Sequence, residues 1–218
     1  MMESEWLTST DPIAMLHFLM GKVSDRKLRR FACRCCRHPV VWDLLQRRSA
    51  EELVEVAERY VEGDATWDQV IHAAQIAPQG TLSGGTRRGH RPQPRHLRTA
   101  SQAQRAALSL ADPNAFHAAW GTITIAANLL ESTPCDLMRE MFGPLPFWLI
   151  EIDPTWRTPL VMQLTHQIEM MHDYGLMPIL CDALQDAGCM DAELIAHCQA
   201  QTVHVRGCWV MQLLLGRE

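Results

Sequence analysis

Apolar side chains recur every three or four residues along most of the chain, and this spacing places them on one face of an α-helix. Alternating apolar and polar runs, which mark β-strands, are scarce. Ser49 and Glu52 are expected to form a capping box at the start of one helix. The predicted helices cover residues 12–20, 24–37, 50–62, 66–77, 99–110, 113–130, 134–142, 159–174, 178–187, 191–198 and 205–215. The expected fold class is therefore mainly α, an irregular multi-helix bundle with little or no β-structure.

One stretch breaks the helical pattern. Residues 78–98 read PQGTLSGGTRRGHRPQPRHLR, so that Gly, Pro, Arg and His take the place of the apolar residues. This composition is typical of a flexible linker or a long surface loop. The predicted organisation is an N-terminal helical part (1–77), a flexible basic loop (78–98) and a C-terminal helical part (99–218). We expect the two helical parts to form one continuous domain.

Composition then narrows the class of protein. Hydrophobic residues make up 47% of the 218 positions, which is enough to bury a sizeable core. No run approaches the roughly 18 apolar residues of a membrane span, so none is expected. The first residues are acidic and lack a basic region, which argues against a signal peptide. The eight cysteines are consequently expected to be reduced thiols of a cytoplasmic protein.

Charge is divided unevenly along the chain. Lys and Arg number 16 against 12 Asp and Glu in residues 1–110, but 4 against 13 in residues 111–218. In helix 24–37, the rotation of about 100° per residue gathers five basic side chains on one face. They are Arg26, Lys27, Arg30, Arg34 and Arg37. This basic face could bind phosphates or an acidic partner, together with the arginine-rich residues 87–98. Alternatively, it is a solvated face, or it neutralises the acidic C-terminal half. Residues 87–98 contain no Phe, Tyr or Trp, so base stacking is unsupported.

Cys33 falls near the boundary between the apolar and basic faces of the same helix. Arg29 and Arg37 lie four residues before and after it, on the same side. Two guanidinium groups favour a thiolate and would lower the pKa of this thiol. The sequence therefore offers Cys33 as the candidate for the most reactive thiol, with a semi-exposed structural cysteine as the alternative.

Cysteine and histidine accumulate near the C-terminus, within residues 181–208. His204 and Cys208 are four residues apart and could chelate one ion if a helix begins before His204. Cys189 and Cys198 could complete the four ligands that zinc prefers. No CxxC pair occurs in this segment, so the spacing matches no common zinc motif. The alternative is that these cysteines line a helical core and that no cofactor is bound.

The two ends of the chain resemble a family of small helical proteins of planctomycete bacteria. The resemblance covers residues 5–37, including SDRKLRRFACRCCR, and roughly residues 135–218, including DAGC and HVRGCW. Residues 64–130 match poorly. The resemblance implies a helical cytoplasmic protein. It implies neither an activity nor catalytic residues, because none is established for the family.

No nucleophile elbow, P-loop, HExxH or GxGxxG motif occurs, so the sequence names no catalytic residue and favours a non-enzyme. The expected function is contact with a protein partner. The candidates for partner binding are the basic face and, near the C-terminus, His204, Arg206 and Trp209. One alternative is an accessory protein that binds nucleic acid through the basic face and residues 87–98. The other is a zinc-stabilised protein, or a thiol-dependent protein that uses Cys33.

Overall fold

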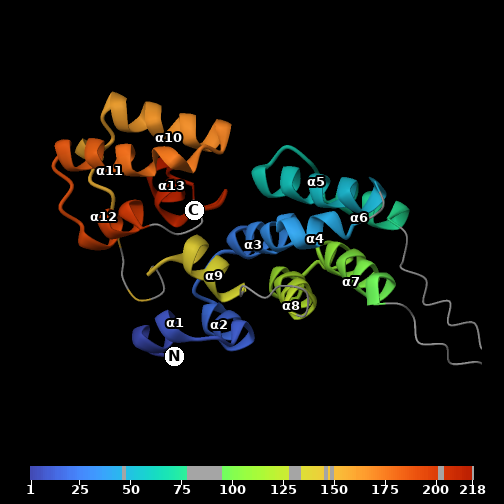
Figure 1. Cartoon of the computed structure of the whole chain (residues 1–218). Helices are drawn as coiled ribbons and strands as arrows, with labels where there is room; N and C mark the ends of the chain where they lie inside the picture. The colour runs from blue at the N-terminus through green and yellow to red at the C-terminus, as the bar shows by residue number, and fades with distance from the viewer. Residues whose placement is uncertain are drawn as a thin grey trace, which may run out of the picture. The chain divides into compact units, whose positions relative to one another are not determined.

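The computed structural model describes residues 1–45, 48–77, 95–127, 134–144, 147, 150–200 and 204–217, with residues 95–99 described by their backbone alone. No strand occurs among these residues, which confirms the mainly α fold class (Figure 1). The first helices are α1 (Glu3–Thr8), α2 (Pro12–Leu19), α3 (Asp25–Arg37), α4 (Pro39–Asp43), α5 (Arg48–Glu62), α6 (Trp67–Ile76) and α7 (Arg95–Ser109). They are followed by α8 (Ala115–Ala126), α9 (Pro134–Phe142), α10 (Pro159–Met171), α11 (Met177–Asp186), α12 (Ala192–Gln199) and α13 (Trp209–Leu215). None of the described helices combines the length and the apolar character that crossing a membrane requires.

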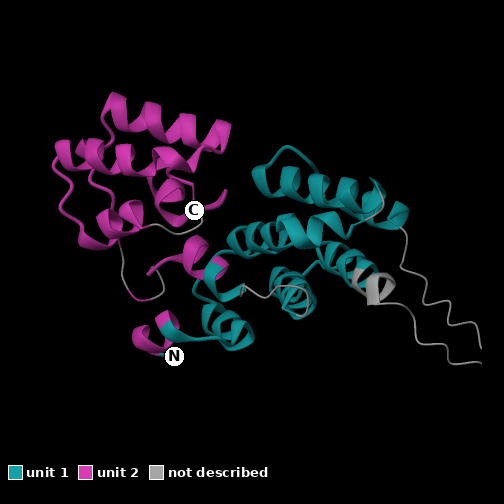
Figure 2. Ribbon diagram, in the orientation of Figure 1, with its two compact units in different colours: residues 1, 8–136 teal, residues 2–7, 137–218 magenta. Residues whose placement is uncertain are grey.

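The contacts divide the chain into two compact units (Figure 2). The N-terminal unit holds residues 8–136 with Met1, and the C-terminal unit holds residues 2–7 and 137–218. The boundary therefore falls inside α9 and not at residues 78–98, because α7 and α8 pack against α3 in the N-terminal unit. Of the predicted basic loop, residues 78–94 lie outside the described residues, and residues 95–98 belong to α7.

α3 is the central helix of the N-terminal unit. It begins where the Ser24 hydroxyl accepts a hydrogen bond from the backbone N–H of Lys27, and it packs against α5, α7 and α8. Because several neighbours cover it, its buried residues come from both of the predicted faces and include Phe31 and Arg30. α5 begins one residue before Ser49, so Ser49 cannot be its N-cap and the predicted capping box is wrong.

The C-terminal unit is built on α10 to α13, with the last part of α9 and with α1. α11 and α12 form a hairpin, in which Gly188 takes a φ of +87° and the Cys189 N–H bonds to the Leu184 carbonyl at 2.9 Å. α10 packs against both α11 and α13. The sequence pattern did not predict α1, yet its Trp6 is buried and the Trp6 carbonyl accepts a hydrogen bond from Arg139 Nε of α9 at 3.1 Å. α1 is therefore a packed part of this unit.

Candidate metal centre

Four polar side chains meet inside the C-terminal unit. One potential ligand atom of each lies within 4.8 Å of those of the other three, so the group could hold a metal ion. The four are Glu140 of α9, His197 of α12, His204 of the segment after α12, and Cys208 immediately before α13. The side chains of His197, His204 and Glu140 are each at most 13% exposed, and Cys208 is fully buried. We call this group the Glu140–Cys208 cluster.

A tight turn, and not a helix, brings His204 and Cys208 together. The backbone N–H of Cys208 bonds to the Val205 carbonyl at 2.9 Å, and α13 begins only at Trp209. Gly207 occupies the third position of this turn with a φ of +93°, where a residue with a Cβ would be strained. The condition stated for chelation, a helix that begins before His204, is therefore not met, although the two side chains do meet.

A second glycine sets the position of Glu140. Gly143 follows α9 with a φ of +55°, and a Cβ built there would lie only 2.6 Å from atoms of the Trp209 ring. Only glycine allows the end of α9 to approach the first residue of α13 this closely. Because Glu140 lies one turn earlier on α9, the close approach places its carboxylate beside Cys208 and the two imidazoles.

Hydrogen bonds within the cluster centre on the Glu140 carboxylate. Its Oε1 accepts from His204 Nδ1 at 3.0 Å and from the Val205 N–H at 3.4 Å, and its Oε2 lies 3.6 Å from His197 Nε2. His204 Nε2 lies on the opposite edge of the ring. That nitrogen is buried and has no hydrogen-bond partner within the part of the chain that the structure describes. An ion shared with Glu140 would therefore be bound by His204 through Nδ1, the nitrogen that faces the carboxylate, with the ring proton on Nε2.

Burial sets the protonation of the other two groups. It lowers the pKa of His197 to about 4, against a smaller opposing effect of Glu140, so the imidazole is neutral at pH 7. Burial raises the pKa of the Cys208 thiol well above its ordinary value, and the charge of Glu140 raises it further. In the absence of a cation, Cys208 is therefore a thiol, which donates to Glu140.

The donor set is chemically selective. It offers one sulfur, two imidazoles and one carboxylate, and these are the three ligand types that zinc takes in proteins. Tetrahedral zinc separates a nitrogen from a sulfur ligand by about 3.5 Å, given zinc–ligand distances of about 2.0 and 2.3 Å. The His197 Nε2–Cys208 Sγ distance of 3.0 Å lies within about 0.5 Å of that value.

The predicted zinc ligands are brought together only in part. His204 and Cys208 belong to the cluster, whereas Cys189 and Cys198 lie in the apolar core of the C-terminal unit. His197, which precedes Cys198, takes the place expected for that cysteine. Glu140 was missed because it lies more than 50 residues away in the chain and no motif connects it to the cysteines.

The chain was compared with protein-family models, curated proteins and solved structures. None of them matches. The function is therefore argued from the geometry and chemistry of the chain itself.

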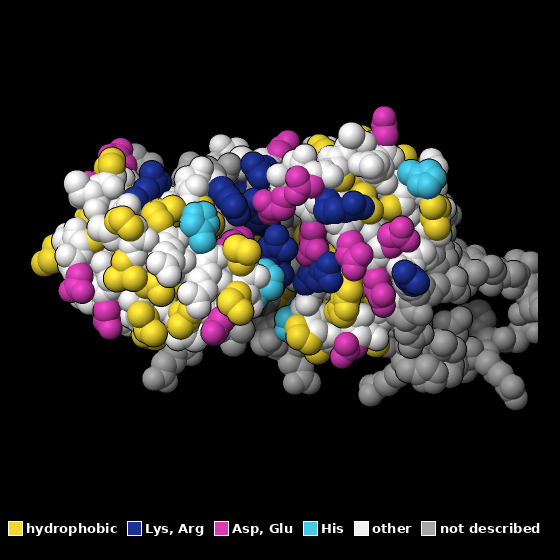
Figure 3. Space-filling model, turned by 90° about the horizontal axis from the view of Figure 1, so that it is seen from above, with side chains coloured by type: hydrophobic (Ala, Val, Ile, Leu, Met, Phe, Trp, Pro, Cys, Tyr) yellow, Lys and Arg dark blue, Asp and Glu magenta, His cyan; other side chains and the backbone are white. Residues whose placement is uncertain are grey.

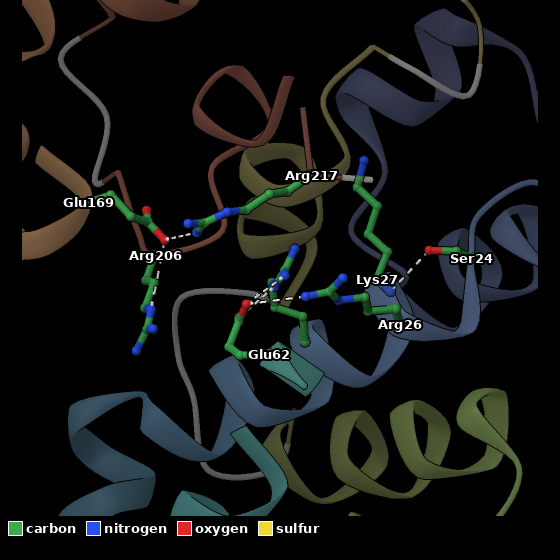
Figure 4. Close-up of polar contacts among 8 residues, drawn as sticks. Ser24, Arg26, Lys27, Glu62, Glu169, Arg206 and Arg217 are labelled. Atoms are coloured by element: carbon green, nitrogen blue, oxygen red, sulfur yellow. Dashed lines mark hydrogen bonds and ion pairs between the residues drawn. The ribbon is translucent and has the colours of Figure 1, made fainter. Parts of the chain in front are cut away.

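The basic face of α3 is paired within the N-terminal unit. Arg26 contacts Glu62 of α5 (Figure 4). Arg30 binds the same carboxylate through two bonds of 3.2 Å. Arg37 binds Glu58 of α5 through bonds of 2.9 and 2.6 Å. These carboxylate partners of Arg26, Arg30 and Arg37 thus come from α5. On the face drawn in Figure 3, Lys and Arg side chains of this unit likewise lie beside Asp and Glu side chains.

Cys33 is 2% exposed, and burial raises the pKa of its thiol well above the ordinary value. The Glu58 carboxylate raises this pKa further, whereas Arg29 and Arg37 lower it by less. The expected lowering of the pKa is therefore wrong. The physical reason is that neighbouring helices cover α3 on the side where the sequence indicated a boundary with solvent.

The remaining partner-binding candidates are placed as follows. Lys27 and Arg34 are half-buried on α3. Trp209 is 2% exposed and the His204 side chain 5%, so neither presents a surface to a partner. Arg206 is partly exposed and, with Arg217, approaches Glu169 of α10 (Figure 4). Contact with a protein partner stays a prediction.

Proposed function

We propose that the C-terminal unit is a zinc-binding helical module, in which one ion held by the Glu140–Cys208 cluster stabilises the fold. The observation that carries this proposal is the convergence of four ligand atoms within 4.8 Å of one another, from three separate segments of the chain. An ion there would link α9, α12 and the start of α13. Packing of these helices against one another would then depend on the ion as well as on apolar contacts.

Charge supports zinc over a monovalent or trivalent ion. A carboxylate from Glu140 and a thiolate from Cys208 carry two negative charges, and the imidazoles add none. A divalent ion makes the cluster neutral, which suits a site from which water is largely excluded. Four protein ligands also complete a tetrahedral shell, as in structural zinc sites, and leave no open position for a substrate. The proposal is accordingly of a structural, non-catalytic ion.

The test is metal stoichiometry in full-length protein without a histidine tag, after removal of metal with a chelator and titration with zinc. We expect one zinc per chain and a rise in the midpoint of urea unfolding. At free zinc of about 100 times Kd, the free energy of unfolding should rise by about 2.7 kcal/mol. Binding should release about one proton, because Cys208 changes from thiol to thiolate, and calorimetry in buffers of different ionisation enthalpy measures this number.

Two cysteine variants sharpen the test. Cys208→Ser should abolish stoichiometric zinc binding, and it should remove the sulfur-to-metal charge-transfer band of protein loaded with cobalt. Cys198→Ser is the matched control, because Cys198 is equally buried and follows a cluster residue directly, yet lies outside the cluster. The proposal is overturned if wild-type protein binds no zinc, or if Cys198→Ser loses zinc as completely as Cys208→Ser does.

A further inference from the structure

A hydrogen bond from Trp209 fixes the tautomer of His197. The indole Nε1–H donates to His197 Nδ1 at 3.1 Å. An indole nitrogen can only donate, so Nδ1 must accept and cannot carry a proton. The proton of the neutral imidazole is therefore on Nε2, from which it can be donated to Cys208 Sγ at 3.0 Å.

This tautomer is incompatible with a metal on His197. The nitrogen within reach of the other cluster atoms is Nε2, at 3.0 Å from Cys208 Sγ and 3.6 Å from Glu140 Oε2. To bind an ion, Nε2 must offer a lone pair, and the ring proton must then be on Nδ1. Nδ1–H and the indole N–H of Trp209 would face each other as two donors, and neither would have an acceptor.

We infer that Trp209 is a positioning residue that holds the metal-free cluster in its non-binding tautomer, and that zinc binding displaces the indole N–H from His197. This inference rests on the proposed zinc site. Trp209 thereby lowers the affinity for zinc, and its own environment reports whether the ion is bound. Since the Trp209 ring lies against Gly143, displacement of the indole also changes the contact between α9 and α13.

The proton changes balance as follows. The S–H bond of Cys208 breaks, its proton passes to solvent, and a bond forms between sulfur and zinc. The Nε2–H bond of His197 breaks, an Nδ1–H bond forms by exchange with solvent, and the Nε2 lone pair binds zinc. The net result is one proton released per zinc bound, with no oxidation or reduction.

The direct test uses wild-type protein and nuclear magnetic resonance. Long-range ¹H–¹⁵N correlation of the His197 ring should show Nε2–H in the metal-free protein and Nδ1–H after addition of zinc. The indole N–H signal of Trp209, assigned by its loss in Trp209→Phe, should move on zinc binding and exchange faster with solvent. An Nδ1–H tautomer in the metal-free protein, or an indole signal unchanged by bound zinc, would overturn the inference.

Zinc affinity provides the second test. Trp209→Phe keeps an aromatic ring and removes the donor, so it should bind zinc about three- to tenfold more tightly than wild type, the range expected for loss of one competing hydrogen bond. Trp6→Phe is the matched control, because Trp6 is also a fully buried tryptophan of the C-terminal unit. Its zinc affinity should equal that of wild type.

The outcomes separate the two proposals. No zinc binding by wild-type protein overturns the zinc site and this inference together. Zinc binding that Trp209→Phe leaves unchanged or weakens, in a variant whose circular dichroism matches wild type, overturns the inference alone. If Trp209→Phe does not fold, the spectra of the wild-type protein decide the question.

Discussion

Substitution of Gly143 by alanine tests the packing that positions Glu140. An alanine at a φ of +55° costs about 1–2 kcal/mol, because the left-handed region brings Cβ close to the backbone. The new Cβ would also lie 2.6 Å from the Trp209 ring, and overpacking of this kind costs about 1–3 kcal/mol. We expect Gly143→Ala to lower the free energy of unfolding by about 2–5 kcal/mol.

Gly188→Ala is the control that isolates the ring contact. Gly188 also has a positive φ, of +87°, and belongs to the same unit, but no described atom lies within 4 Å of a Cβ built there. It should therefore show the backbone cost alone, about 1–2 kcal/mol. Urea unfolding of both chelator-treated variants, followed by far-ultraviolet circular dichroism, gives the comparison. We expect Gly143→Ala to be the less stable by about 1–3 kcal/mol.

Equal losses in the two variants would refute the reasoning. They would mean that the Trp209 ring can move aside at little cost, and that the end of α9 is not held against α13. The placement of Glu140 beside Cys208 would then lack its physical basis. A changed dependence of the free energy on urea would instead indicate a change in the surface exposed on unfolding, and midpoints alone would not be compared.

Three further results are expected. All eight cysteines are buried, so a thiol reagent should modify Cys33 in native protein far more slowly than in urea; similar rates would contradict its raised pKa. Glu62→Gln removes the carboxylate bound to the buried Arg30 and should lower the free energy of unfolding in urea by about 1–3 kcal/mol. Glu52 is exposed on the same helix, and Glu52→Gln should change this free energy by no more than about 0.5 kcal/mol. His38 caps α4 as an acceptor, and burial lowers its pKa. The stabilisation by the His38 cap should therefore be complete above about pH 6.5, and it should be lost as the pH falls through the pKa of His38 in the folded protein. His38→Asn keeps an acceptor that does not titrate and should remove this part of the pH dependence.

Local signals in the sequence were enough to place most helices. The range 134–142 coincides with α9, and the range 24–37 matches α3 to within one residue. No helix was predicted at α4, which begins at Pro39, because proline interrupts the interior of a helix; in the first turn it is well tolerated. α1 was missed because it is short and its stability depends on Trp6 packing against residues distant in the chain. Failures of this kind occur where tertiary packing outweighs a local pattern.

The candidate site was predictable only where its residues are neighbours in sequence. His204 and Cys208 are only four residues apart, so any compact local structure brings their side chains close together. The choice between His197 and Cys198 depends on which side of α12 faces the cluster, since adjacent helical residues point about 100° apart. Glu140 depends on how α9 packs, which no periodicity along the chain encodes. The ion-pair partners of Arg26 and Arg37 on α5 are likewise not encoded by the periodicity of α3.

Two features of the cluster act on metal affinity in opposite directions. Glu140 is 7% exposed, and its ion-pair partners among the described residues are the imidazoles of His197 and His204. Because His197 is neutral at pH 7, it contributes only a dipole, and a divalent cation would relieve the cost of burying this carboxylate. The indole of Trp209 opposes the ion through the tautomer of His197. Glu140→Gln should therefore weaken zinc binding, whereas Trp209→Phe should strengthen it. The zinc affinity of the wild-type protein reflects both of these opposing effects. Changes in the same direction would show that both variants act only by loosening the fold.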